Sequence, residues 1–307
     1  MIEVQQLSKS YGQVQALKEV SFTVEAGHIV GFLGANGAGK TTTMDIMCGC
    51  IGADMGVVKI AGFDITENPI EAKKSLGYLP DSPPLHGEMR VEDFVRYAGE
   101  LHKIPKRQIK QKVDFALEKL SLTEVRKRLV GNLSKGYRQR VALAQAIVHD
   151  PKVLILDEPT EGLDPNQIAH IRELIRSLAG QHTILLSSHI LSEVQNTCDR
   201  IIIIHRGSIV QQGTYHELVQ SMEAGSVYRL KVARHAELIL PFLRGMPGIL
   251  NPQPTTDAKI FEFGVSSQSS SELVEAVVKG VMEKDCGLRE LAEKTKSLEE
   301  VFFKLTH

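Results

Sequence analysis

Tryptophan is absent from this 307-residue sequence, aromatic residues make up only 5% of it, and cysteine occurs four times. Cys48, Cys50, Cys198 and Cys286 form neither a Cys-x-x-Cys metal pair nor a dense disulfide framework, so a reducing compartment is expected. Long apolar runs are missing too: purely aliphatic stretches are short, as at residues 201–204, whereas a spanning helix needs about 20 apolar residues. We therefore expect a chain that does not cross a membrane by itself.

An excess of charge of one sign is also lacking. The sequence has 36 Lys and Arg against 37 Asp and Glu, a formal net charge of −1, so no overall field attracts nucleic acid. Glu3 comes early and no apolar stretch follows it, so a secretory signal is not expected. The 42% hydrophobic content is typical of soluble globular proteins, and the length favours about two domains.

Buried strands and amphipathic helices alternate along the first two thirds of the chain. The apolar runs at residues 28–33, 153–156 and 183–186 predict strands that are covered on both faces, as in a parallel α/β sheet. Helical spacing of apolar residues at 91–101 and 109–120 predicts a helical insertion over about 90–150. Strands at 200–205 and 208–212 flank Arg206-Gly207, which predicts a tight hairpin turn.

The pattern changes after residue 220. Residues 226–232 and 259–265 alternate like half-buried strands, and residues 271–283 and 297–306 have helical spacing. Residues 251–254, which contain two prolines, and residues 266–271 are expected to be loops. We predict two domains, residues 1–220 and a small α+β domain at residues 221–307.

A glycine-rich loop follows the strand that ends at Leu33. Residues 34–41 fit the pattern GxxxxGK[ST] in the strand-loop-helix context that this motif requires. Its backbone N–H groups and the following helix N-terminus would bind phosphate, with Lys40 reaching the β- and γ-phosphates and the Thr41 hydroxyl binding Mg²⁺. We call residues 34–41 the phosphate loop.

Two acids follow a second buried strand. Asp157 and Glu158 come directly after residues 153–156, where burying two charges is costly unless they meet a cation or a reacting water. We expect Asp157 to hold Mg²⁺ through a water and Glu158 to orient or deprotonate the attacking water. Elsewhere, Ser134 is a plausible N-cap for a helix that continues to about Val148, and with Gly136 it offers another anion site.

With these three elements in this order, the sequence resembles the nucleotide-binding subunit of an ABC transporter over residues 1–220. Residues 133–137, which we call the signature segment, read LSKGY where the commonest family form is LSGGQ. The longer LSKGYRQRVALAQAI is similar to the branch that serves type 2 ABC exporters, including gliding-motility and multidrug export ATPases. The ending SLEEVFFKLT extends the resemblance to the whole chain. The implied fold is an α/β nucleotide-binding domain, a mixed sheet core with a helical subdomain, followed by the α+β domain.

The resemblance assigns further roles. Tyr11 corresponds to the aromatic residue that stacks on adenine, Asp164 belongs to the D-loop, and His189 is the switch histidine that contacts the γ-phosphate and Glu158. Asp81 stands where the family has the Q-loop glutamine; its carboxylate could ligate Mg²⁺ but adds negative charge near the phosphates. The catalytic prediction is Glu158, His189 and Lys40, and the Mg²⁺ ligands are Thr41, Asp81 and Asp157. The predicted ATP-binding residues are Tyr11, Gly34, Ala35, Asn36, Gly37, Ala38, Gly39, Lys40, Thr41, Thr42, Asp81, Ser134, Lys135, Gly136, Asp157 and Asp164.

The implied partners are a second nucleotide-binding subunit, as a homodimer, and an integral membrane permease. ATP would lie between the phosphate loop of one copy and the signature segment of the other, and the protein would be cytoplasmic, on the inner face of the cell membrane. Residues 90–140 hold 14 basic and 6 acidic residues, an excess of +8, which indicates either a solvated helical face or attraction to an anionic leaflet.

Two other functions are weighed against ATP-driven export. A soluble ABC ATPase that acts on ribosomes or DNA would carry two cassettes or a long coiled coil, whereas this chain has one cassette and no sustained heptads. A P-loop GTPase would need an NKxD-like motif, which is missing, and would leave residues 133–140 unexplained. No nucleic-acid partner is expected.

Overall fold

The computed structural model describes residues 1–220, 226–265 and 270–294. The chain divides into two compact units, the first comprising Met1–Tyr215 and the second beginning at His216. The domain limits proposed from the sequence, 1–220 and 221–307, remain a prediction. The helix predicted at residues 297–306 lies outside the described residues, as does most of the loop predicted at 266–271.

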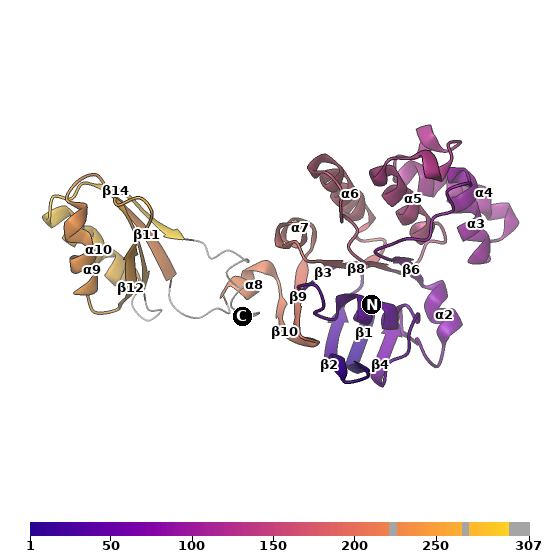
Figure 1. Ribbon diagram of the computed structural model, residues 1–307, viewed down its shortest axis with the longest axis horizontal. Coiled ribbons are helices and arrows are strands. Elements are labelled where there is room, and N and C mark those ends of the chain that lie inside the picture. Colours follow the sequence, from indigo (N-terminus) through magenta and orange to yellow (C-terminus); the bar gives the residue numbers. More distant parts are fainter. Residues whose placement is uncertain (221–225, 266–269, 295–307) are drawn as a thin grey trace. The chain divides into compact units, whose positions relative to one another are not determined.

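The first unit contains two sheets (Figure 1). The smaller one is antiparallel in the order β2-β1-β4-β5, with β1 (Ile2–Tyr11), β2 (Val14–Val24), β4 (Met55–Ile60) and β5 (Phe63–Asp64). The larger one has the order β10-β9-β3-β8-β7-β6, with β3 (Ile29–Leu33), β6 (Leu76–Leu79), β7 (Val153–Leu156), β8 (Thr183–Ser188), β9 (Arg200–His205) and β10 (Ser208–Gly213). Only the β9–β10 pair is antiparallel in this larger sheet, so β3, β7 and β8 end at one edge.

A shared hydrophobic core fills the space between the two sheets. Helix α1 (Lys40–Met47) contributes Met44 and Met47, and β3 contributes Phe32, which is fully buried. Every residue of β3, β7 and β8 is buried, as the unbroken apolar runs predict for strands covered on both faces. The core holds β3 and β7 in place, and it therefore positions the phosphate loop, which follows β3, and the acidic pair, which follows β7.

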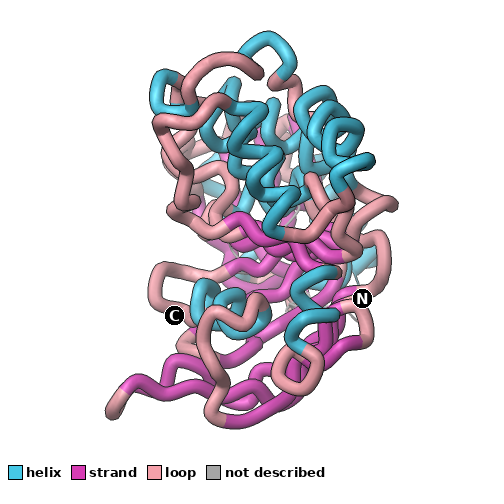
Figure 2. The backbone as a smooth tube through the Cα atoms, turned by 90° about the vertical axis from the view of Figure 1, so that its right-hand side faces the viewer, coloured by secondary structure: helices cyan, strands magenta, loops and turns pink. Residues whose placement is uncertain are grey.

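Helices cover the other face of the larger sheet (Figure 2). The predicted helical insertion is present as α3 (Val91–Leu101), α4 (Lys106–Lys119) and α5 (Lys135–Ile147), with short 3₁₀ turns at Thr123–Val125 and Val130–Asn132. The remaining helices of the unit are α2 (Pro69–Lys74), α6 (Pro165–Leu178) and α7 (Leu191–Thr197), and α8 (Tyr215–Gln220) straddles the division. In the part of the chain that is described, no helix is both long and apolar enough to span a membrane.

The second unit is a βαββαβ arrangement. Its sheet has the order β12-β13-β11-β14, with β11 (Ser226–Val232), β12 (Ile249–Pro254), β13 (Ile260–Val265) and β14 (Leu288–Lys294). A 3₁₀ turn (Ala236–Leu238) leads into α9 (Ile239–Arg244), which packs with α10 (Ser270–Glu283) around a separate core that includes Leu230, Phe263 and Val277. These elements agree with a small α+β fold.

The prediction of a loop at residues 251–254 is wrong. Residues Ile249–Pro254 form β12, whose register with β13 runs from Ile249 opposite Val265 to Pro254 opposite Phe261. Proline cannot donate to a ladder, but β12 pairs with a single neighbour in the described sheet, and an edge strand tolerates proline on its open side. The two prolines mark an edge rather than a loop.

Candidate functional site

The phosphate loop joins β3 to α1 in a conformation that needs glycine. Gly39 has φ +108° and Gly37 has φ +78°, values that side chains rarely adopt. A Cβ atom on Gly39 would lie 2.9 Å from the Ala16 carbonyl oxygen. Lys40 begins α1 with 6% of its surface exposed, and its ammonium donates to the Gly34 carbonyl oxygen at 2.8 Å. The loop therefore folds around its own lysine.

Asp157 stands at the end of β7, next to the end of β8, and is completely buried. One carboxylate oxygen, Oδ1, accepts a hydrogen bond from the Ser187 hydroxyl at 2.5 Å, while Oδ2 has no partner among the described residues. Burial raises the pKa of Asp157, and the Ser187 hydroxyl, followed by the nearby Thr41 hydroxyl, acts in the opposite direction. A buried carboxylate with an unused oxygen beside Thr41 suits a cation.

Glu158 connects the phosphate loop to the end of β8. Its Oε1 lies 3.2 Å from the Lys40 ammonium, and its Oε2 lies 2.9 Å from His189 Nδ1. Its backbone N–H donates to the Ser187 hydroxyl at 2.8 Å. Glu158 also has φ +46°, a left-handed conformation that costs about 1 kcal/mol for a residue with a side chain. Three contacts thus hold a strained residue in place, so Glu158, His189 and Lys40, the predicted catalytic set, are brought together.

Two adjoining hollows open above these residues. The first, about 370 Å³, is lined by Ala16, Asn36, Gly37, Gly39, Lys40, Thr41, Thr42, Asp81, Glu158 and Glu161. The second, about 740 Å³, shares Asp81, Glu158 and Glu161 and continues to His189, Lys135 and Arg138. A hydrogen bond with Asp81 raises the pKa of Glu161, because two carboxyl groups that share a proton resist ionising together. The predicted Asp81 therefore faces the same space as the phosphate loop.

The signature segment lies beside the D-loop of the same chain. Ser134 and Lys135 are exposed and Gly136 is buried. The Ser134 hydroxyl caps α5 by accepting from the Tyr137 N–H at 3.5 Å, and Asp164 caps α6 by accepting from the Gln167 N–H at 3.0 Å. None of these residues lines the hollow over the phosphate loop. Lys135 borders the second hollow, and Ser134 and Gly136 line neither, so the signature segment is not part of the hollow over the phosphate loop of its own chain.

Tyr11 does not join the other predicted residues. It ends β1 with 51% of its surface exposed, and the Lys9 ammonium lies 5.7 Å from its ring centre. Its side chain lines neither hollow, whereas Ala16 of the adjacent strand does. The part of the predicted set that gathers around the loop is Asn36, Gly37, Gly39, Lys40, Thr41, Thr42, Asp81, Asp157, Glu158 and His189, with Gly34 and Ala35 as carbonyl partners of Lys40.

Sequence reasoning missed two residues of the site. Ser187 contacts both acids of the pair, and Glu161 faces the loop. A serine at the end of a buried strand carries no strong signal, and its role depends on the parallel alignment of β7 with β8. Glu161 follows the acidic pair by three residues, so its proximity in the sequence was the available clue.

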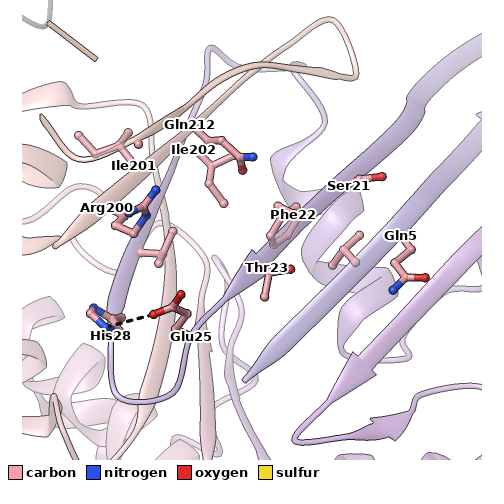
Figure 3. Close-up of a pocket in the computed structure, with 13 residues that line it drawn as sticks. Gln5, Ser21, Phe22, Thr23, Glu25, His28, Arg200, Ile201, Ile202 and Gln212 are labelled. Carbon is pink, nitrogen blue, oxygen red and sulfur yellow. Dashed lines mark ion pairs between the residues drawn. The ribbon is translucent and has the colours of Figure 1, made fainter. Parts of the chain in front are cut away.

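A further hollow of about 470 Å³ lies between the two sheets at the other end of β3 (Figure 3). Its labelled residues include Glu25, whose carboxylate is 3.8 Å from His28 Nε2, and Phe22. It is lined by the start of β3 and β9, whereas the phosphate loop follows the end of β3. None of the predicted site residues lines it.

Comparisons with known proteins give one consistent picture. The ABC transporter family profile matches residues 17–161. The chain is 33% identical over 307 residues to the uncharacterized ABC transporter ATP-binding protein YxlF of Bacillus subtilis, covering 100% of both chains. It is 39% identical over 210 residues to NatA of B. subtilis, covering 68% of this chain and 85% of NatA. It is 37% identical to the bacitracin transport ATP-binding protein BcrA of Bacillus licheniformis, covering 71% of each.

Solved structures agree with the sequence relatives. An ATP-binding subunit of an ABC transporter superposes with TM-score 0.66 at 29% identity, covering 72% of this chain and 92% of that one. CbiO1 from Clostridium perfringens, part of the complex cbiONQ, superposes with TM-score 0.64 at 27% identity, covering 72% and 93%. The phosphate loop, the buried acidic pair and the full-length relatives together place this chain in the family of ABC transporter ATP-binding proteins, as an ABC ATPase.

Proposed function

We propose that this ATPase pairs with a second copy around two ATP molecules and drives export through a separate membrane permease. The observation that supports this is the exposure of Ser134 and Lys135 on a chain whose phosphate loop is also open. A loop alone leaves the γ-phosphate accessible to water on one side, and an exposed helix N-terminus from another copy is suited to close it. Each chain would then supply half of two identical sites.

Hydrolysis would proceed from the Lys40–Glu158–His189 contacts. Lys40 is paired with Glu158, so an arriving γ-phosphate competes with that carboxylate for the ammonium. Once freed from Lys40, Glu158 is able to accept a proton from the attacking water, and His189 orients it through Oε2. His189 would thereby report whether the γ-phosphate is present.

The residues present fit Mg²⁺. The unpartnered Asp157 Oδ2 and the Thr41 hydroxyl are oxygen donors of the kind that Mg²⁺ prefers, and Asp81 faces the same hollow. Among the described residues, no group of three or more His, Cys, Asp or Glu forms a complete metal site, so nucleotide phosphates would have to complete the coordination. When bound, Mg²⁺ would neutralise charge on the phosphates.

The dimer is tested by complementation between two defective copies. Glu158→Gln should form an ATP-dependent dimer on size exclusion, because ATP binds and is not hydrolysed. In that background, Lys40→Ala should abolish the dimer by weakening the phosphate loop, and Ser134→Arg should abolish it by blocking the signature segment. Mixing the two double variants restores one intact composite site, so dimers should reappear only in the mixture.

Either of two results would contradict this arrangement. One is a Glu158→Gln, Ser134→Arg protein that dimerises with ATP as well as Glu158→Gln alone. The other is a wild-type chain whose ATPase rate per molecule is independent of protein concentration down to the nanomolar range. Both would mean that the signature segment of a second copy is not needed.

The permease is proposed to dock on an apolar groove of about 530 Å³. Its lining combines the segment after Asp81, with Pro83 and Pro84, and the helical subdomain, with Phe94 and His102. Because Asp81 also faces the phosphate loop, movement of this segment would connect nucleotide state to the partner. BcrA, a bacitracin transport protein, and CbiO1, part of an ABC transporter complex, are relatives whose names support a transport partner.

Isolation of the native complex tests the partner and the location together. A multi-span membrane protein should co-purify from the inner membrane with the wild-type chain, and less of it with a Pro84→Arg variant. Co-purification with ribosomes or DNA instead would favour the alternative, a soluble ABC ATPase that acts on a nucleic-acid or ribosomal partner.

A further inference from the structure

The α3–α4 turn carries four cations without a compensating acid. Lys103, Lys106, Arg107 and Lys110, which we call the basic corner, are all exposed, and none makes an ion pair with the described residues. From residue 101 to residue 113 the sequence contains no Asp or Glu. In contrast, Lys112 pairs with Asp150 at 2.9 Å, and Arg126 pairs with Glu92 at 2.8 Å. These two cations are thus neutralised, while the four cations of the basic corner are not.

Apolar side chains are exposed next to the same cations. Leu101, the last residue of α3, has 63% of its surface exposed, and Phe115 on α4 has 46%. The two helices lie side by side as a hairpin (Figure 1). Leu101 comes two residues before Lys103, and Phe115 lies about one and a half helical turns beyond Lys110. Cations combined with exposed apolar groups match the boundary between lipid headgroups and acyl chains. A nucleic-acid surface offers phosphates but no apolar layer for an exposed leucine, so lipid fits this combination of side chains better.

The basic corner adjoins the groove proposed for the permease. His102 lines that groove, and Lys103 follows it directly in the chain. Helix α3 itself runs from Phe94 in the groove to the corner. A membrane protein seated in the groove would bring the corner near the bilayer surface, where each cation close to anionic lipid contributes about 1 kcal/mol, roughly fivefold in partitioning.

We propose that the basic corner binds the anionic phospholipid surface of the membrane directly, as a second contact beside the permease. The proposal rests on the proposed function for the presence of a membrane nearby, but the contact itself needs no partner. It would align the ATPase on the bilayer and raise the effective concentration of the groove at the permease. Its strength should fall with salt, because exposed charges are screened.

Vesicle flotation of the full chain tests the contact. Wild type should float with vesicles that contain phosphatidylglycerol and not with pure phosphatidylcholine, and high salt should release it. A variant with all four corner residues changed to Gln should lose at least about 20-fold in partitioning. The matched control changes Lys18, Arg244, Lys259 and Lys279 to Gln, which removes the same charge from exposed positions elsewhere, and should float like wild type.

Three results would overturn the proposal. The first is equal flotation with both kinds of vesicle, and the second is an equal loss of flotation in the control variant. The third is binding of a generic single-stranded RNA by the wild type at the same salt concentration, if only the corner variant loses that binding.

A fold check by circular dichroism and ATP-dependent dimerisation in the Glu158→Gln background accompany every variant. If the corner variant still dimerises and still co-purifies with a spanning subunit, loss of flotation concerns the lipid contact alone. If no spanning subunit is found but flotation stays corner-dependent, the permease proposal fails and the lipid contact remains.

Discussion

The charged side chains of two regions in the first unit differ in their surroundings: those of the nucleotide site are buried and paired, whereas those of the basic corner are exposed. At the nucleotide site, Lys40 and Glu158 have side chains that are 6% and 10% exposed, and each has a specific partner at hydrogen-bonding distance. At the basic corner, four cations face water and make no ion pair within the described residues. A buried charge is costly without its partner, whereas exposed charges of one sign act together over several ångströms. The site should therefore be sensitive to atomic detail, and the corner only to the sign of its charge.

The largest effect is expected from Glu158→Gln. The amide cannot accept a proton from water, so kcat should fall by about 10²- to 10⁴-fold while ATP affinity is retained. Steady-state ATPase rates and calorimetry measure the two quantities. Glu161→Gln is the matched control, since Glu161 lines the same hollow without touching Lys40 or His189, and its rate should fall less than about tenfold. A Glu158→Gln enzyme with wild-type turnover would rule out the general-base role.

Lys40 should tolerate no replacement. Lys40→Ala removes a cation from the phosphates and should weaken ATP binding by about 10- to 100-fold by calorimetry. Lys40→Arg should lose nearly as much, because a planar guanidinium does not fit an ammonium site that is enclosed by the Gly34 and Ala35 carbonyls. Unchanged affinity in the alanine variant would contradict phosphate binding by the loop.

Ser187→Ala should affect both stability and rate. It removes the donor to Asp157 Oδ1 and the acceptor of the Glu158 N–H, and leaves two buried polar groups without partners. The free energy of unfolding should fall by about 2 to 4 kcal/mol, measured by urea titration. Because Glu158 loses one of the contacts that hold its left-handed conformation, kcat should fall as well. Ser177→Ala, at an exposed serine on α6 whose hydroxyl donates to the Leu174 carbonyl oxygen, is the control and should change neither.

A smaller, pH-dependent effect is expected at a stacked histidine pair. The rings of His102 and His149 are 3.5 Å apart, and His149 Nε2 lies 2.9 Å from the Leu76 carbonyl oxygen. Burial, followed by the neighbouring His102, lowers the pKa of His149 to about 4 from 6.5, against the opposing influences of the Leu76 carbonyl and then of Asp150. Because the folded pKa is depressed, this contribution to stability is complete above pH 6.5 and is lost as the pH falls toward 4.

The size of this contribution follows from the shift. A difference of 2.5 units corresponds to about 3 kcal/mol at most, and partial exposure reduces it. Urea titrations between pH 7 and pH 4 should therefore show a steeper loss of stability in wild type than in His149→Gln. His235→Gln, at an exposed histidine, should leave the slope unchanged. Identical slopes in wild type and His149→Gln would contradict the buried neutral ring.

The smallest effect is expected from arginine at the basic corner. Lys106→Arg with Lys110→Arg keeps both charges, so vesicle flotation should stay within about twofold of wild type. Lys40→Arg provides the comparison: replacing lysine by arginine should strongly weaken ATP binding at the nucleotide site, whereas the same replacement should leave lipid binding at the basic corner almost unchanged. A large loss of flotation in this variant would mean that the corner recognises a specific shape rather than a charged surface.

Several features of the site were predictable because they depend on neighbours in the sequence. The phosphate loop needs Gly37 and Gly39 at positive φ next to Lys40, and residues that are close together in the sequence meet this requirement. The caps at Ser134 and Asp164 likewise depend on the residues that follow them. The edge strand at Ile249–Pro254 was missed for the converse reason: proline looks like a loop residue until its place at the rim of a sheet is known.

The sequence by itself determined the family, the buried strands and the chemistry of the loop and the acidic pair, because short-range patterns and covalent order carry that information. Only the tertiary structure decided that Ser187 joins the two acids, that Lys40 pairs with Glu158, and that Tyr11 stands apart from the hollow. These relations arise from the parallel alignment of β3, β7 and β8, which brings residues more than 100 positions apart to one sheet edge.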